Sequence, residues 1–330
     1  MLNSALLLLT VSLLSITTAK RHIPKQIGGD DISFAFTNAL RGIAILIIMV
    51  GHISGTMGTV ALSPLGGTGV ALFLFLSGFG LNESWKRHGA SRYWNKKIKR
   101  VFIPYFIVIS ILAIVRGRMS PYEYLLDICG IKTSYWYIGY LLRWYLIFWL
   151  TSRFTFRYRM RIMALCALGF LFMLPNIEAE QSFSFIAGVW TGTSTDRVCR
   201  ITAKQMAAVG FAAFLLGTIF LAIKQLPSIR IHVDDYVYNI VQLFIKLPYA
   251  VALMSIVWIF PIIQQSRFLL FAGAVSYELY LVHMPFYGMV NGNLYIAILL
   301  IASSLCVAKL FNMLNAKIAK FDISGYMKRA

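Results

Sequence analysis

Long apolar runs separated by short polar segments recur along the whole chain. Several runs approach the length of about 20 residues that a helix needs to cross a hydrocarbon layer about 30 Å thick. A backbone surrounded by lipid has to satisfy its own hydrogen bonds, so spans of this kind are helical. The pattern therefore predicts an all-α integral membrane protein, a bundle of about ten core transmembrane helices, at 41–58, 68–84, 101–116, 136–151, 162–175, 183–193, 205–223, 239–263, 267–290 and 293–311.

The N-terminus carries an additional apolar stretch, from Leu6 to Ile16, which basic residues follow. In a secretory signal peptide the positive charges come before the apolar run. The reverse order favours an extra N-terminal helix that is not cleaved, over a cleaved signal or a misassigned start. We therefore divide the chain into an N-terminal hydrophobic segment with a basic linker, residues 1–33, and a membrane domain, residues 34–330.

Composition and charge also indicate a chain that lipid covers. Hydrophobic residues make up 59% of the sequence and charged residues 13%, more apolar than a soluble domain. The net charge of +19 could by itself indicate nucleic acid as a partner. Most of the 31 Lys and Arg residues, however, lie in alternate connecting segments, which is the positive-inside pattern. We therefore expect anionic lipid and no nucleic acid as partner, with the cytoplasmic segments at 20–41, 85–100, 152–161, 194–204, 264–267 and 312–330.

The four cysteines are far apart in the sequence, and none belongs to a CxxC pair or a Cys/His cluster. Zinc sites and the disulfide frameworks of small domains need such clusters. We therefore expect no metal site.

Arg41 and His52 are the candidate chemical groups of the first core span. A helix rises about 1.5 Å per residue, so the step between them covers roughly 16 Å, about half of the hydrocarbon layer. At about 100° per residue this step closes nearly three full turns, so the two side chains share a similar face. A histidine at this depth merits a functional hypothesis. From position alone, a neutral histidine satisfied by a neighbouring helix is an equally good interpretation.

Four motifs, in this order along the chain, resemble the acyltransferase 3 family. The first is its hallmark, an arginine, ten intervening residues and a histidine, here Arg41 to His52. The second, GVALFLFLSGF at 69–79, is similar to the second span of the family. The third, KIKRVFIP, resembles its R-x-x-R-x-x-x-P element, with Lys97 in place of the first arginine and Arg100 as the second. The fourth, SYELYLVHMP at 276–285, matches the ending S-Y-x-x-Y-L-x-H-x-P.

The resemblance implies a membrane-bound O-acyltransferase of the bacterial cytoplasmic (inner) membrane. Such proteins take an acyl group, often acetyl, from cytoplasmic acyl-CoA and transfer it to a hydroxyl of an extracytoplasmic glycan. Acetyl-CoA is then a co-substrate, and no cofactor is bound permanently. A periplasmic partner, if one completes the transfer, would be a separate protein.

The resemblance also implies roles for individual residues. His52 would be the catalytic histidine that accepts the proton of the acceptor hydroxyl. Arg41, together with Lys97 and Arg100, would bind the phosphates of acyl-CoA and orient the thioester toward His52. Direct transfer and an acyl-enzyme on His52 are both compatible with this assignment.

Glu278, His283, Arg143 and Trp136 are possible supporting residues. Glu278 and His283 lie roughly 140° apart on a helix, so they do not share a face. Glu278 could support His52 or pair with Arg143, and a structural ion pair is an equal alternative. His283 could contact substrate or cap a helix. Trp136 belongs to an aromatic cluster of the kind that anchors helices at a membrane surface.

The main alternative function is a transporter or flippase of a glycan or a lipid-linked glycan. It would explain the spans and the buried charges, but not the basic set combined with the Arg41 to His52 spacing. A structural membrane subunit is a third interpretation, and it gives no reason to bury His52, Arg143 and Glu278 in one chain.

Overall fold

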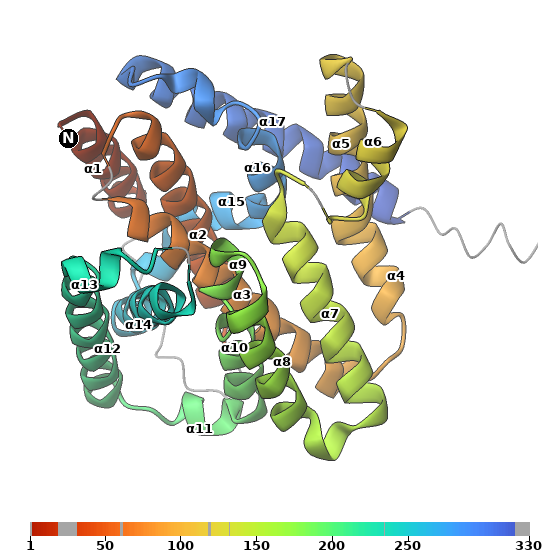
Figure 1. The fold of residues 1–330 in the computed structure, drawn as a ribbon, viewed down its shortest axis with the longest axis vertical. Helices are drawn as coiled ribbons and strands as arrows, with labels where there is room; N and C mark the ends of the chain where they lie inside the picture. Colours follow the sequence, from red (N-terminus) through yellow and green to blue (C-terminus); the bar gives the residue numbers. More distant parts are fainter. Residues whose placement is uncertain are drawn as a thin grey trace, which may run out of the picture.

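The computed structural model describes residues 2–18, 32–59, 62–117, 120–131, 133–233 and 235–320, and these residues form helices and no β-strand (Figure 1). The basic linker expected within 1–33 lies mostly in 19–31, outside the described residues. The helices are α1 (Leu2–Thr17), α2 (Phe34–Thr56), α3 (Ser63–His88), α4 (Tyr93–Lys97), α5 (Ile103–Arg116), α6 (Pro121–Ile128), α7 (Trp136–Phe154), α8 (Arg159–Met173), α9 (Asn176–Ala179), α10 (Ser184–Thr193), α11 (Thr195–Cys199), α12 (Ala203–Ile223), α13 (Pro227–Arg230), α14 (Tyr236–Ile259), α15 (Arg267–Ala274), α16 (Ser276–His283) and α17 (Leu294–Lys320).

Among the described residues, 6 helices are long and apolar enough to cross a membrane. They are α2, α3, the continuous segment Tyr93–Arg116, α12, α14 and α17. The all-α class and the membrane-spanning helices are therefore confirmed. The count of about ten core spans stays a prediction, because four expected spans fall on α7, α8, α10 and the α15–α16 pair, which are shorter or less apolar.

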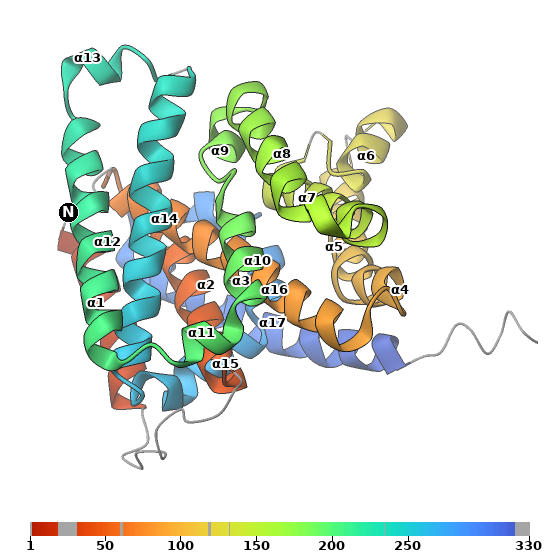
Figure 2. The same cartoon turned by 90° about the horizontal axis from the view of Figure 1, so that it is seen from below.

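Helices α2 and α3 form the centre of the bundle. They pack against each other, while α15 covers α2 and α10 covers α3. Aromatic side chains such as Trp144, Tyr105 and Phe185 are fully buried around this centre. Helix α12 instead packs mainly on α14, and Figure 2 shows the two side by side at one edge of the molecule. The candidate chemistry on α2 therefore lies in the most enclosed part of the bundle.

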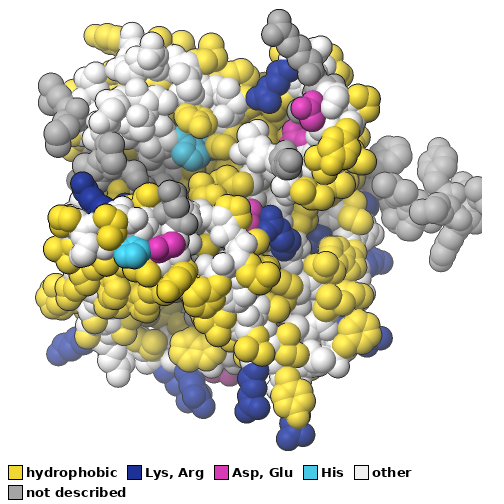
Figure 3. Space-filling view, viewed as in Figure 1, with side chains coloured by type: hydrophobic (Ala, Val, Ile, Leu, Met, Phe, Trp, Pro, Cys, Tyr) yellow, Lys and Arg dark blue, Asp and Glu magenta, His cyan; other side chains and the backbone are white. Residues whose placement is uncertain are grey.

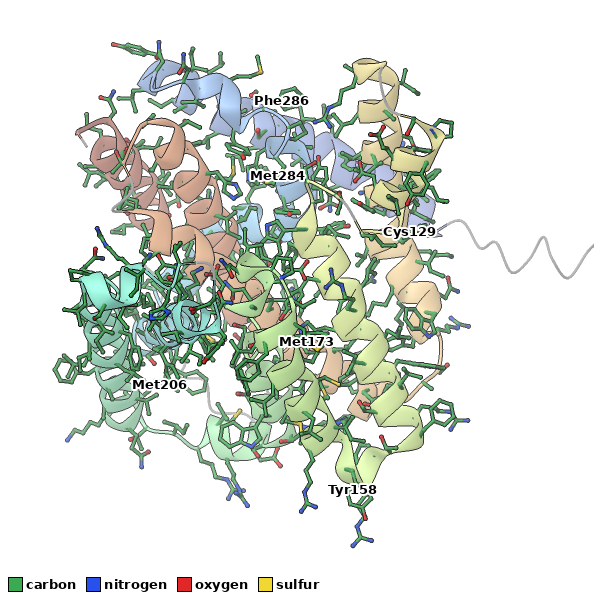
Figure 4. All side chains as sticks on the ribbon, in the orientation of Figure 1. Cys129, Tyr158, Met173, Met206, Met284 and Phe286 are labelled. Atoms are coloured by element: carbon green, nitrogen blue, oxygen red, sulfur yellow. The ribbon has the colours of Figure 1, made fainter. Side chains whose placement is uncertain are left out.

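Basic side chains gather along the lower edge of the molecule in Figure 3. Figure 4 places Tyr158, which lies between α7 and α8, at this same edge. Phe286, which follows α16, lies toward the opposite, upper end (Figure 4). The segment 152–161, one of the expected cytoplasmic segments, is therefore part of the basic edge.

Helices α3 and α10 cross with their backbones in contact. A Cβ atom on Gly78 would collide with the carbonyl oxygen of Phe185, and one on Gly188 with the carbonyl oxygen of Phe75. Both obstacles are backbone atoms, which cannot move aside as a flexible side chain can. The crossing therefore requires glycine on both helices.

We expect Gly188→Ala to lower the apparent melting temperature of the purified protein, or its yield, because overpacking of this kind costs about 1–3 kcal/mol. Gly169→Ala is the matched control. A Cβ atom added to Gly169, which lies in α8, would have nothing within 4 Å, so alanine should be neutral or stabilising there. Equal melting temperatures for Gly188→Ala and the wild type would contradict the close crossing.

Candidate active site

Four basic side chains line a cavity of about 380 Å³ between α2, α3, α7 and α16. They are Arg41, Lys96, Lys97 and Arg100. An adjoining opening of about 630 Å³ shares Arg41 and Arg100 with this cavity. The three basic residues singled out from the sequence thus lie together, and Lys96 joins them.

An irregular helix contributes Arg100 to the wall of the basic cavity. Between α4 and α5 the chain forms a π-helical segment, Ile98–Phe102, and Pro104 follows in the first turn of α5. Such π-segments interrupt the regular rotation of side chains and often occur at functional sites. The ammonium group of Lys97 lies 4.3 Å from the centre of the Tyr145 ring, so a cation–π contact holds it at the cavity wall.

His52 lies in a second cavity, of about 440 Å³, whose wall carries several polar side chains among apolar ones. Lys246 forms an ion pair there with Glu180, and both side chains are buried. The amide of Gln181 donates to the carbonyl oxygen of Gly67 at 3.0 Å. The side-chain oxygen of Gln242 is buried and has no hydrogen-bond partner among the described residues. This wall offers hydrogen-bonding groups to a hydroxyl-bearing molecule. The second cavity is also lined by Trp136.

The two cavities adjoin at a pair of tyrosines. Tyr137 and Tyr280 line both of them, with ring centroids 5.4 Å apart. Arg41 and His52 belong to the same helix, α2, and each lines a different cavity. A single helix therefore connects a cavity suited to an anion with a cavity that contains a histidine.

His52 and His283 form a hydrogen-bonded pair. The distance from His52 Nδ1 to His283 Nε2 is 3.2 Å, and His283 Nδ1 lies 2.8 Å from the carbonyl oxygen of Leu279. His283 is fully buried and ends α16, just before Pro285 breaks the helical pattern. The structure therefore fixes the second histidine firmly against the first.

The hydrogen bonds of this pair define which nitrogen carries each proton. A carbonyl oxygen only accepts, so the Nδ1 atom of His283 carries a proton. In neutral His283 the Nε2 atom is then an acceptor, and the proton between the rings belongs to Nδ1 of His52. This leaves Nε2 of His52 with a free lone pair. In this tautomer the Nε2 atom of His52 can accept a proton, which is the property that a general base needs.

Glu278 and Arg143 do not interact with each other. Glu278 accepts hydrogen bonds from Asn312 and Asn315 of α17, each at 3.1 Å. Arg143 instead makes two contacts with Glu178, at 2.6 and 2.9 Å. The expectation that Glu278 pairs with Arg143 is therefore wrong, and a role for Glu278 in supporting His52 stays a prediction. Glu278 joins α16 to α17, and Arg143 joins α7 to α9.

Several lining residues were not predicted from the sequence, namely Lys96, Tyr137, Glu180, Gln242, Lys246 and Tyr280. Two of them carried a usable signal. Lys246 is a lone lysine inside an apolar run, and Tyr280 belongs to the SYELYLVHMP motif. The others lie on helices or loops whose sequence shows no distinctive spacing.

The fold and the site together define an integral membrane protein with a cavity lined by basic side chains that adjoins a cavity containing a histidine. A family model described as an acyltransferase domain, that of the acyltransferase 3 family, matches residues 34–313. The chain belongs to this family, which confirms the resemblance of its four motifs, and it is a membrane acyltransferase. No curated protein and no solved structure matches the chain.

Proposed function

We propose that this protein is an O-acyltransferase, with acetyl as the acyl group, that uses acyl-CoA as donor and a glycan hydroxyl as acceptor. The observation that carries the proposal is the direct contact between two cavities of different chemistry. One is lined by Arg41, Lys96, Lys97 and Arg100, and the other contains His52. Donor and acceptor can therefore meet without either one crossing the protein.

The basic cavity is the donor site of this proposal. Coenzyme A is a polyanion, and guanidinium groups bind phosphate through paired, charge-assisted hydrogen bonds. Arg41 and Arg100 supply such groups. Lys97 supplies a point charge in place of the arginine typical of the family, and its position over the Tyr145 ring limits its reach. The thioester then extends toward Tyr137 and Tyr280.

The second cavity, which contains His52, is the acceptor site of this proposal. The free carbonyl oxygen of Gln242 suits a hydroxyl group of a sugar, and Trp136 offers an aromatic face to a sugar ring. An acceptor hydroxyl beside His52 gives its proton to Nε2 while its oxygen forms a bond to the thioester carbonyl carbon. The carbon–sulfur bond then breaks, and the protonated His52 returns the proton to the departing thiolate of CoA.

This geometry favours direct transfer of the acyl group from acyl-CoA to the acceptor hydroxyl. Two adjoining sites place both reactants together, and proximity of this kind supplies much of the barrier reduction. An acyl-enzyme on His52 would add a second chemical step.

The direction of transfer follows from charge. Basic segments stay in the cytoplasm, so the basic edge seen in Figure 3 and the donor cavity face that side. The acceptor cavity then opens to the far side of the bacterial inner membrane.

The proposal is tested with the full chain purified into lipid nanodiscs. We expect it to bind acetyl-CoA and to release free CoA, slowly with water as acceptor and faster when an oligosaccharide acceptor is added from a panel of neutral and acidic glycans. Mass spectrometry should then detect the O-acetyl group on the glycan. Glycan movement across a vesicle membrane with no acetyl-CoA binding would instead support the transporter or flippase alternative.

A further inference from the structure

The hydroxyl group of Tyr280 is buried without a hydrogen-bond partner among the residues that the structure describes. The side chain is 4% exposed. Buried tyrosine hydroxyls normally find a partner, because an unpaired polar group in a protein interior is costly. A molecule that binds beside this hydroxyl would supply the missing hydrogen-bond partner.

Tyr280 lies where the donor and acceptor cavities meet. It lines both cavities, and its ring is 5.9 Å from the ring of His283, the partner of His52. The backbone N–H of Tyr137, in the first turn of α7, approaches the oxygen atom of Tyr280. An N–H donor can engage only the lone pairs of the oxygen, so the O–H proton still has no acceptor among the described residues.

Two other tyrosines near this junction use their hydroxyl protons inside the protein. Tyr135 donates its hydroxyl proton to the carbonyl oxygen of Leu281 at 2.7 Å. Tyr277, which lines the donor cavity, donates to the carbonyl oxygen of Val101, also at 2.7 Å. Tyr140 also has a buried hydroxyl without a partner among the described residues, but it is not among the residues that line either cavity. Among these four tyrosines, Tyr280 alone combines a hydroxyl without a described partner with a place at the junction.

We propose that Tyr280 is a catalytic residue, the donor of a hydrogen bond to the oxyanion that forms on the thioester carbonyl. The proposal rests on the acyl transfer described above. As the acceptor oxygen adds to the carbonyl carbon, the electron pair of the C=O bond moves onto its oxygen, and the Tyr280 O–H stabilises that charge. The pair returns to re-form C=O as the carbon–sulfur bond breaks. Tyr280 keeps its proton throughout.

A donor in this place would act on the transition state more than on the bound substrate. The carbonyl oxygen of a thioester is a weak acceptor, whereas the oxyanion is a strong one. Removing the donor should therefore lower kcat and leave substrate binding almost unchanged. A purely structural role for the hydroxyl would change stability instead.

Tyr280→Phe tests the proposal, because it removes the hydroxyl and keeps the ring. In nanodiscs we expect kcat for CoA release to fall about 100- to 1,000-fold, the effect of losing one oxyanion donor. The dissociation constant for CoA and the melting temperature should stay close to those of the wild type. Tyr135→Phe is the matched control, because it removes a hydroxyl that is used inside the protein. It should lower the melting temperature and leave kcat within a few-fold of the wild type.

Other outcomes have distinct meanings. Full turnover by Tyr280→Phe, alongside a wild type that turns over acetyl-CoA, overturns the oxyanion role and leaves the acyltransferase proposal standing. A weaker affinity for CoA with an unchanged kcat also overturns it, because the hydroxyl would then serve binding. A wild type that neither binds nor consumes acetyl-CoA refutes the proposed function and this role together.

Discussion

Replacing His52 with glutamine is expected to lower acyl transfer by about 10²- to 10⁴-fold, the contribution of a positioned general base. Glutamine fills a similar volume and can still donate a hydrogen bond to His283, but it has no group that takes a proton from a hydroxyl. Binding of acyl-CoA should persist, because the cations that we assign to it line the other cavity. The measurement is the rate of CoA release in nanodiscs, paired with a CoA binding titration.

His232→Gln provides a matched control for this change. His232 lies beyond α13, where its side chain pairs with Asp235 at 2.6 Å and is partly exposed. The same substitution there should leave turnover and CoA binding as in the wild type. If His52→Gln kept more than a small part of the wild-type rate, another group would be the base, and His52 would be a structural residue.

Replacing Arg41 or Arg100 with alanine is expected to weaken acyl-CoA binding by roughly 10- to 100-fold each, the effect of losing a charge-assisted hydrogen bond. Both guanidinium groups line the donor cavity and the opening beside it. The affinity of the wild type should also fall as salt rises, because screening weakens contacts between charges that water reaches. Titration of CoA at several NaCl concentrations measures both effects.

Arg157→Ala is the control for the loss of a basic residue in general. Arg157 belongs to the short helix Phe156–Tyr158, where its guanidinium lies over the Tyr158 ring, and it lines neither the donor cavity nor its opening. This variant loses the same charge, but outside the donor cavity. If a defined site binds CoA, its affinity for CoA should not change. An equal loss of affinity in Arg157→Ala would show that CoA responds to the overall charge of the basic edge rather than to a defined site.

The sequence predicted the parts of the site that lie on one helix or in one short motif. The spacing of Arg41 and His52 places both on a similar face of α2. Lys97 and Arg100 belong to one basic segment. Regular helical geometry is enough to relate such residues. His283 could be placed near the end of its helix, but its contact with His52 joins α16 to α2 and follows no local rule.

The contacts of Arg143 and Glu278 show why the rest could not be predicted. Either carboxylate, that of Glu178 or that of Glu278, could have neutralised Arg143. The choice depends on how α9 and α16 pack against α7, which no local pattern records. Lys246 and Glu180 likewise meet only because α14 lies beside the segment after α9. Long-range packing therefore decided each of these ion pairs.

The number of membrane spans was hard to predict for a different reason. Hydropathy identifies long, uniformly apolar helices such as α12, which packs mainly on α14 and is otherwise largely exposed. Helices that line the site, such as α7 and α16, carry tyrosines, arginine and histidine, and α16 is short. Polar side chains at the site therefore make α7 and α16 less conspicuous in hydropathy than α2, α3 or α12.

The most direct test of the central claim is transfer across a membrane by uniformly oriented proteoliposomes. Labelled acetyl-CoA is supplied only on the side of the basic edge, and the oligosaccharide acceptor only on the other side. We expect labelled glycan to accumulate on the acceptor side with the wild type and not with His52→Gln. Acetylation that occurs only when donor and acceptor are on the same side would contradict the claim that the two cavities open to opposite faces and meet at Tyr137 and Tyr280.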